Sequence, residues 1–325
     1  MQTTVFRKWM ILAACCCMPA VSLQAARVIE PIQTVSEPLG LDPGIVALGD
    51  RLFHDLRLSR NNTVSCAHCH RLNAGGDDDM PVSIGIEGKA GDVNAPTVFN
   101  LNLNIAFFWD GRASTLEELV GMPLKDDREM DTDWPEVLSK LGKDRKMVAD
   151  FERLFPGKGM TKETIARSIA DFMRSLVTLD SPMDRWLNGE KDALTHEQLR
   201  GYRLFKSYGC VACHQGEAVG GNMYAGMGAF QDYFRDRKRP LTIADNGRFN
   251  VTGDERDRHV FKVPGLRLVT LTAPYFHDAG AATLEEAIVI MGKYQLGRQI
   301  PKQDVSDIKA FLGSLLGTHP RLVSP

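Results

Sequence analysis

The feature that most constrains this sequence is a five-residue motif, Cys-x-x-Cys-His, that occurs twice. The first copy spans residues 66–70 and the second spans residues 210–214, which begins 144 residues (210 − 66) further on. Two cysteines at this spacing, followed at once by a histidine, are typical of covalent c-type haem attachment, in which the thiols bond the porphyrin and the histidine ligates the iron. The pair of motifs predicts two similar domains, each enclosing one haem c.

The predicted attachment residues and iron ligands all come from these two motifs. A zinc site or a redox dithiol is the alternative for a Cys-x-x-Cys pair, but neither requires a histidine after the second cysteine. The only other cysteines are residues 15–17, close to the N-terminus, so the expected mature chain has none left for a disulfide. The attachment residues are Cys66, Cys69, Cys210 and Cys213, and the proximal iron ligands are His70 and His214.

The N-terminus has the pattern of an export signal. Arg7 and Lys8 precede an apolar run over residues 9–18, and small residues near Ala25 offer a cleavage site. The alternative is lipoprotein processing at residues 12–15. We expect residues 1–25 to be a signal peptide and the mature protein to act in a bacterial periplasm. No membrane span is expected, because no other apolar run approaches the roughly 20 residues that a span needs.

Length and charge narrow the function further. The 325 residues carry 39 basic and 41 acidic side chains, without a basic block that could follow a phosphate backbone. Nucleic acid is therefore not an expected partner. The length allows two domains of ordinary size, which we place at residues 26–180 and 181–325, with the boundary near residues 178–194.

Helix-start signals are frequent and strand signals are few, which predicts a mainly α fold. Asp42 before Pro43 predicts a helix start, and Thr161 opens a segment with apolar residues at helical spacing. A last helix is expected over about residues 305–316, and the polar, glycine-rich residues 73–91 are expected to form a loop. Capping boxes are expected at Thr115, Thr195 and Thr283.

A second repeat supports the two-domain interpretation. Residues 108–118 align without gaps on residues 276–286, an offset of 168 (276 − 108), and Pro96 and Pro264 show the same offset. Each domain is therefore expected to contain a haem motif, a proline turn, an aromatic-Asp turn and a capped helix. His277 takes the place of a tryptophan in this repeat, either to contact a haem propionate or as a hydrogen-bonded core histidine.

The repeat also predicts that the two irons differ. A second strong ligand makes an electron-transfer haem, whereas an open position admits a small molecule. Met291 is the candidate ligand in the second domain, with Met223 and Met227 as competitors and a core methionine as the structural alternative. The matching position in the first domain, 123 (291 − 168), is a proline without a ligand atom. We expect chemistry at the first iron and electron transfer at the second.

A series of short motifs between about Leu48 and Leu316 occurs in the order found in a known family. These motifs lie at residues 58–59, 75–77, 83–85, 94–97, 108–112, 129–130, 261–264, 274–278 and 291–292. The series resembles the bacterial di-haem cytochrome c peroxidase family, which also contains the MauG-type enzymes. The resemblance implies two cytochrome c-like domains over nearly the whole mature chain, and a homodimer.

The resemblance also implies roles for single residues. Trp109 would lie between the haems as an electron bridge, where the alternative is an ordinary core aromatic. Glu129 would be the acid/base group at the peroxide site, where the alternative is a surface carboxylate. Asn94 and the backbone carbonyls of Thr272 and Pro274 would hold calcium between the domains, since calcium prefers hard oxygen ligands.

Two positions depart from the family pattern. Many family members have a histidine after Ser-Ile-Gly that blocks the peroxidatic iron until the other haem is reduced, and this chain has Ile86 there. The distal glutamine ten residues after the tryptophan is replaced by Leu119. We therefore expect an iron that is open in the fully oxidised enzyme, with one polar group fewer to orient peroxide.

The expected function is reduction of hydrogen peroxide to water with electrons from a small periplasmic cytochrome c or cupredoxin. A MauG-like enzyme that oxidises tryptophan or tyrosine of a partner protein is one alternative, which Met291 disfavours because MauG-like members have tyrosine there. A non-enzymatic di-haem electron carrier is another. Pro123 and Glu129 argue against a carrier, because a carrier needs neither an open iron nor a distal acid.

Overall fold

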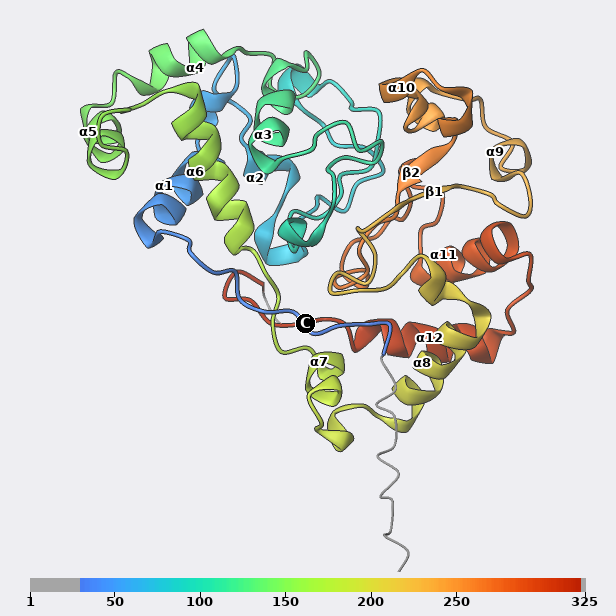
Figure 1. Cartoon of the computed structure of the whole chain (residues 1–325). Coiled ribbons are helices and arrows are strands. Elements are labelled where there is room, and N and C mark those ends of the chain that lie inside the picture. Colours follow the sequence, from blue (N-terminus) through green and yellow to red (C-terminus); the bar gives the residue numbers. More distant parts are fainter. Residues whose placement is uncertain (1–29, 323–325) are drawn as a thin grey trace, which may run out of the picture. The chain divides into compact units, whose positions relative to one another are not determined.

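The computed structural model describes residues 30–322, and the predicted signal peptide lies outside these residues. The described part is mainly helical, as expected, and its order of elements is shown in Figure 1. The α-helices are α1 (Pro43–Phe53), α2 (Cys66–Cys69), α3 (Leu116–Lys125), α4 (Trp134–Leu141), α5 (Arg145–Leu154), α6 (Lys162–Ser175), α7 (Pro182–Leu187), α8 (His196–Tyr208), α9 (Tyr233–Asp236), α10 (Phe249–Thr252), α11 (Leu284–Ile290) and α12 (Lys302–Gly313).

Short elements connect these helices. Two strands, β1 (Tyr224–Gly226) and β2 (Val260–Lys262), pair antiparallel, and a single π-helical turn, η9 (Met291–Gln295), extends α11. The 3₁₀ turns are η1 (Leu56–Leu58), η2 (Leu72–Ala74), η3 (Ile86–Gly88), η4 (Leu101–Leu103), η5 (Lys191–Ala193), η6 (Cys210–Ala212), η7 (Ile243–Asn246) and η8 (Glu255–Asp257).

Most of the predicted helix starts are confirmed by their caps. The Asp42 carboxylate accepts hydrogen bonds from the backbone of Gly44 and Ile45 at 2.7 and 3.1 Å, which satisfies amides that have no partner within the helix. The boxes at Thr195 and Thr283 are complete.

Two expectations about helix ends were wrong. The predicted capping box at Thr115 is incomplete, because the Glu118 carboxylate accepts from the backbone and hydroxyl of Ser114 instead of reaching back to Thr115. The last helix, α12, lies earlier than predicted and ends at Gly313, because the following chain turns so that Thr318 can pair with the backbone of Leu179.

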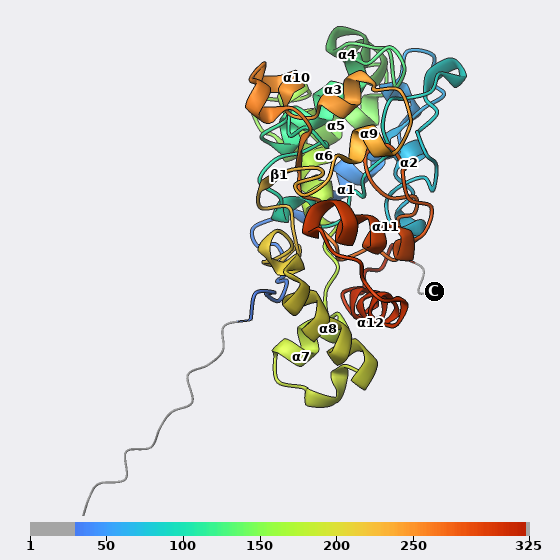
Figure 2. The ribbon, with the colours of Figure 1, turned by 90° about the vertical axis from the view of Figure 1, so that its right-hand side faces the viewer.

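Two long helix pairs form the frame of the molecule. Helix α1 packs across α6, and α8 packs across α12 (Figures 1 and 2). A glycine lies at each crossing: a Cβ on Gly49 would be 1.9 Å from the Ser168 carbonyl oxygen, and one on Gly201 would be 1.8 Å from the Asp307 carbonyl oxygen. The two crossings are thus built alike, by the same close approach of one backbone to another.

Each helix pair belongs to its own large core cluster. The first cluster extends from Leu48 to Leu268 and includes α1, α3 and α6, and the second contains α8 and α12. The two ends of the described chain each pack on the cluster formed mainly by the other half of the sequence. Ile32, near the start, is buried in the second cluster, whereas Leu322, near the end, packs against the first.

The 168-residue repeat is visible in the backbone. Phe107 pairs with Ala113, and Tyr275 pairs with Ala281, in equivalent antiparallel bridges. Helices α3 and α11 begin at the equivalent residues Leu116 and Leu284. No helix within residues 30–322 combines the length and the apolar character needed to cross a bilayer.

The helix crossings predict a specific sensitivity to glycine replacement. Gly201→Ala should destabilise the haem-loaded protein by about 1–3 kcal/mol, because the added methyl group must displace the backbone of α12. Gly313→Ala is the matched control, since a Cβ at that helical position meets nothing within 4 Å. Thermal unfolding followed by circular dichroism measures both variants, and equal melting temperatures would contradict this account of the crossing.

Candidate haem sites and the contact between the repeats

The first Cys-x-x-Cys-His motif forms a single helical turn. Helix α2 begins at Cys66 and ends at Cys69, and His70 follows as its C-cap with its backbone N–H donated to the Cys66 carbonyl. The His70 Nδ1 atom lies 3.0 Å from the carbonyl oxygen of Gly76. A carbonyl partner at Nδ1 fixes that nitrogen as the protonated one, so Nε2 keeps its lone pair for a metal.

The second motif repeats this arrangement. The turn η6 starts at Cys210, and the N–H of His214 again donates to the carbonyl of the first cysteine, at 2.9 Å. His214 Nδ1 faces the Val219 carbonyl at 3.3 Å. Burial lowers the pKa of His214 to about 4 and lowers that of His70 as well. Both rings are therefore neutral at physiological pH, as an iron ligand must be.

The four cysteines of the described chain are unpaired thiols. Burial raises the pKa of Cys66 to about 12 and the pKa values of Cys69 and Cys210 to about 11. Both motifs thus fit covalent haem: each has two thiols on one turn beside an apolar core and an imidazole with a free Nε2.

Glu129 lies beside the first haem motif. Its negative charge raises the pKa of both Cys66 and Cys69, and within residues 30–322 its carboxylate makes no hydrogen bond or ion pair. Burial is the largest cause of the raised pKa of Glu129 itself, followed by the charge of Asp126. The charges of Arg112 and Arg128 oppose this shift in part. A carboxyl group with a raised pKa holds a proton more readily than an ordinary glutamate, as an acid/base group must.

The loop before Glu129 is held against it by the backbone. Ile86 is fully buried, and its N–H donates to the Glu129 carbonyl oxygen at 2.9 Å. A Cβ on Gly85 would lie 2.8 Å from the Glu129 Cα atom, so only glycine permits this approach. The residue after Ser-Ile-Gly is thus an apolar core residue that places Glu129, and it has no atom that could ligate iron.

The predicted bridge residue Trp109 lies where the two repeats meet. Its indole N–H donates to the Asn94 carbonyl at 2.9 Å, and its own carbonyl accepts from the Lys262 N–H of β2 at 2.9 Å. An equivalent hydrogen bond runs in the opposite direction between the repeats: the Asn94 N–H of the first repeat donates to the His277 carbonyl of the second at 2.9 Å. Because 94 and 262, and 109 and 277, are related by the offset of 168, these two bonds form a symmetric pair.

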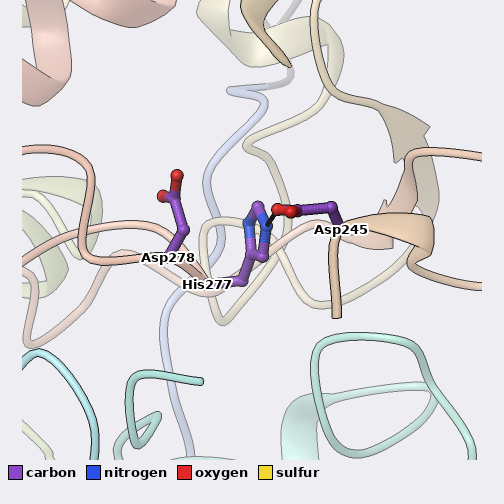
Figure 3. Close-up of side chains that lie close together, drawn as sticks. All are labelled: Asp245, His277 and Asp278. Carbon is purple, nitrogen blue, oxygen red and sulfur yellow. Dashed lines mark hydrogen bonds and ion pairs between the residues drawn. The ribbon is translucent and has the colours of Figure 1, made fainter. Parts of the chain in front are cut away.

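His277 is a hydrogen-bonded core histidine. It is 3% exposed, stacks on Phe261 with ring centroids 4.4 Å apart, and its Nε2 lies 2.8 Å from an Asp245 oxygen (Figure 3). The structure therefore favours the second of the two alternatives that the sequence left open for this residue.

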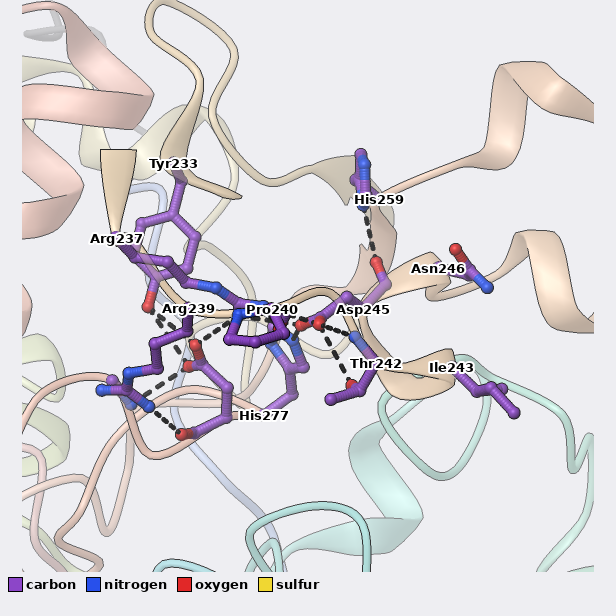
Figure 4. Close-up of polar contacts among 12 residues, drawn as sticks. Tyr233, Arg237, Arg239, Pro240, Thr242, Ile243, Asp245, Asn246, His259 and His277 are labelled. Atoms are coloured by element: carbon purple, nitrogen blue, oxygen red, sulfur yellow. Dashed lines mark hydrogen bonds and ion pairs between the residues drawn. The ribbon is translucent and has the colours of Figure 1, made fainter. Parts of the chain in front are cut away.

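Sequence reasoning missed the polar cluster that surrounds His277. The guanidinium of Arg237 lies between the carboxylates of Asp245 and Asp278, with contacts of 2.6 to 2.8 Å, and the Tyr233 hydroxyl donates to Asp278 (Figure 4). Asp245, His277 and Asp278 could by their spacing hold a metal ion. Arg237 already supplies the positive charge that the two carboxylates need, so we interpret the cluster as an ion-pair network that holds His277 beside Trp109.

The oxygens predicted to bind calcium accept no hydrogen bond within residues 30–322. They are the side-chain oxygen of Asn94 and the carbonyl oxygens of Thr272 and Pro274. Asn94 is buried, and its amide nitrogen donates to the Met80 carbonyl at 2.8 Å, which directs the oxygen elsewhere. Hard oxygens without donors suit calcium.

The candidate sixth-ligand positions also differ in structure. Met291 is half-buried at the junction of α11 with the π-helical turn η9, a kind of irregularity that is frequent at functional sites. Pro123 lies inside α3 at the equivalent position. The competing methionines Met223 and Met227 flank β1, and their backbones bond to Val263 and His259.

Two equivalent Cys-x-x-Cys-His turns in two equivalent helical repeats define a protein of the two-haem c type. Comparison with known proteins gives the same answer: residues 43–192 match the family described as di-haem cytochrome c peroxidase. The chain is 44% identical to the cytochrome c551 peroxidase of Nitrosomonas europaea, over 91% of this chain and 87% of that protein. The chain therefore belongs to the di-haem cytochrome c peroxidase family.

Further relatives agree. The cytochrome c peroxidase Ccp of Escherichia coli is 47% identical over 89% of this chain, which spans only 62% of that longer protein. The cytochrome c551 peroxidase of Pseudomonas aeruginosa is 40% identical over 93% of this chain and 88% of its own length. Among solved structures, a MauG-like protein associated with microbial copper homeostasis superposes with a TM-score of 0.78 at 28% identity, over 91% of this chain and 98% of that one.

One buried acid lies in the motif at residues 75–77, but the sequence assigned it no role. Asp77 is fully buried, and neither carboxylate oxygen has a hydrogen-bond partner in the described chain. Burial raises its pKa to about 7, and the charges of Asp79 and Asp78 add to this shift. The unfolded chain has an aspartate pKa of about 3.9. The folded state therefore binds the proton more tightly, and Asp77 lowers stability as the pH rises from about 4 to 7.

Asp77→Asn should remove this pH dependence. We expect the loss of stability between pH 5 and pH 8 to be smaller in this variant than in the natural protein, because an amide needs no proton to stay neutral. Urea unfolding of the haem-loaded protein at both pH values measures the effect. Asp192→Asn, at an exposed position, is the control, and an unchanged pH dependence in the Asp77 variant would contradict the assignment.

Proposed function

We propose that this protein reduces hydrogen peroxide to water at the haem attached through Cys66 and Cys69. The observation that carries the proposal is Glu129, a partly buried carboxyl group beside those two cysteines, with a raised pKa and no hydrogen bond or ion pair within residues 30–322. Haem iron supplies the electron chemistry when bound. The reaction consumes peroxide, two electrons and two protons, and it yields two water molecules.

The protein's contribution to the bond-breaking step is proton movement. Glu129 would take a proton from one oxygen of the bound peroxide and return it to the other, which would leave as the first water. The two electrons and two further protons would convert the remaining oxygen to the second water. This role requires a carboxyl group that no salt bridge holds in one charge state, and Glu129 forms no salt bridge within the described residues while its partial burial raises its pKa. Leu119, packed on the first core, adds no polar group to this site.

Electron supply is assigned to the second repeat. Electrons enter at the haem attached through Cys210 and Cys213, for which Met291 is the proposed second iron ligand. Trp109 then connects the two sites, because its backbone and indole bond to residues of both repeats. The names of the peroxidase relatives support a small cytochrome c as donor, and a cupredoxin is the alternative donor.

The first iron is proposed to be open without prior reduction of the second. Pro123 has no ligand atom, and Ile86 is a fully buried aliphatic residue whose backbone is bonded to Glu129. The loop therefore has no histidine at this position that could move onto the iron.

Several further assignments are part of the proposal. The two domains correspond to residues 26–180 and 181–325, apart from the exchanged chain ends. A calcium ion lies between them on Asn94, Thr272 and Pro274. The mature protein acts in the periplasm as a homodimer after removal of residues 1–25.

The relatives favour peroxide reduction over the MauG-like alternative. The chain is 40–47% identical to three proteins named as peroxidases, but only 29 and 33% identical to two named methylamine utilization protein MauG. Met291, where MauG-like members have tyrosine, agrees with this ranking.

Replacement of Glu129 tests the proposed function. Glu129→Gln should lower kcat by about 10²–10⁴-fold, because the amide cannot carry the proton, while both haem absorption spectra remain. The measurement is stopped-flow oxidation of a reduced small cytochrome c by peroxide. In the natural enzyme the acidic limb of kcat/KM should lie above the pKa of an ordinary glutamate, since the pKa of Glu129 is raised.

Glu87→Gln is the matched control, because Glu87 is exposed on the neighbouring loop and pairs only with surface cations. Its turnover should equal that of the natural enzyme. Peroxide turnover in Glu129→Gln within twofold of this control would rule out the acid/base role. No turnover in the natural enzyme would instead favour the electron carrier.

A further inference from the structure

Lys262 is a buried cation without a counter-ion. The residue is 9% exposed, and within residues 30–322 its ammonium group makes no hydrogen bond or ion pair. Burial alone lowers its pKa, to about 8, and no neighbouring carboxylate opposes that effect. Burial of an unpaired charge is costly. An anion that the polypeptide does not supply is therefore expected at this position.

The position of Lys262 indicates which anion this is. Its backbone N–H bonds to the Trp109 carbonyl, and two residues later the Pro264 carbonyl contacts the ring of His214. Consecutive side chains of a strand point to opposite faces. Phe261 stacks on His277, so the Lys262 side chain is directed away from that stack. The backbone at Lys262 thus connects Trp109 with the segment that contacts His214 of the second haem motif.

The two repeats differ in charge at the position of Lys262. The equivalent of Lys262 is Asn94 (262 − 168), whose side chain is neutral and whose carbonyl accepts the Trp109 indole N–H. Trp109 is therefore flanked by two equivalent positions, one with an amide and one with an ammonium group. The residue with the positive charge belongs to the repeat that contains the motif at residues 210–214.

We propose that the Lys262 ammonium group binds a propionate carboxylate of the haem attached at Cys210 and Cys213 and so acts as a positioning residue. This inference rests on the haem attachment proposed above. The two opposite charges form a charge-assisted hydrogen bond in a site with little water. The bond offsets the negative charge near that iron, which favours its reduced state, and it ties the haem edge to the strand that touches Trp109.

The test is a spectroelectrochemical titration of haem-loaded protein. Lys262→Met keeps the length of the side chain and removes its charge, and Lys262→Arg keeps the charge. We expect Lys262→Met to lower the midpoint potential of the second haem. The shift should correspond to a three- to tenfold change in the equilibrium between its oxidised and reduced forms, where tenfold equals 59 mV. The midpoint potential of the second haem in Lys262→Arg should differ from that of the natural protein by less than half of that shift. Lys302→Met, at an exposed position, is the control for loss of one charge.

The outcomes separate this inference from the proposed function. Haem content per chain, measured by alkaline pyridine spectra, reports attachment independently of any potential. With two haems present, an unchanged second potential in Lys262→Met, or a shift of the first haem alone, would overturn the inference. A crystal structure of the natural haem-loaded protein needs no variant: Nζ should lie about 2.7–3.2 Å from a propionate oxygen, and an Nζ bonded only to water would also overturn it.

Discussion

The two hydrogen bonds between the repeats are the contacts on which the rest of the arrangement depends. The Lys262 N–H donates to the Trp109 carbonyl, and the Asn94 N–H donates to the His277 carbonyl. In each repeat, the carbonyl of the aromatic turn thus accepts a hydrogen bond from the other repeat. The donor is the residue two positions before the proline of that other repeat, which is Pro264 or Pro96. Because that proline segment also contacts the proximal histidine of its own repeat, the distance between the two haem motifs follows from backbone geometry.

Side chains at these equivalent positions make the two halves chemically different. Trp109 in the first repeat corresponds to His277 in the second. The amide of Asn94 corresponds to the ammonium group of Lys262, and Pro123 corresponds to Met291. The antiparallel bridges and the starts of α3 and α11 are nevertheless equivalent in the two halves. The differences are at the positions to which we assign a charge, an iron ligand and an electron path in the proposed function.

Much of this could be predicted from the sequence, because covalent chemistry and local capping leave short patterns. The haem motifs, the repeat and most of the helix starts depend on residues within a few positions of one another, and so does the loop around residues 73–91. The end of α12 was missed because it is set by the pairing of Thr318 with Leu179, which are distant in sequence. The network of Arg237, Asp245 and Asp278 was missed for the same reason.

Buried ionisable groups were the hardest to foresee. The residues around Asp77 and Lys262 do not predict that the two side chains are buried. Only the packing shows that Lys262 is 9% exposed and that the buried carboxylate of Asp77 has no hydrogen-bond partner in the described chain. Lys262 lay within a recognised motif, and its offset from Asn94 was available from the repeat, but the absence of a counter-ion is a property of three-dimensional structure. Such groups are informative because burial without a partner has to be compensated by something.

The central claim is that two alike scaffolds hold unlike irons, one with an open position and one with methionine. The most direct measurement is low-temperature electron paramagnetic resonance of the fully oxidised, haem-loaded protein. The account predicts one high-spin signal and one low-spin signal, with the low-spin signal altered in Met291→Ala. Two low-spin signals, or a low-spin signal that survives the loss of Met291 unchanged, would contradict it.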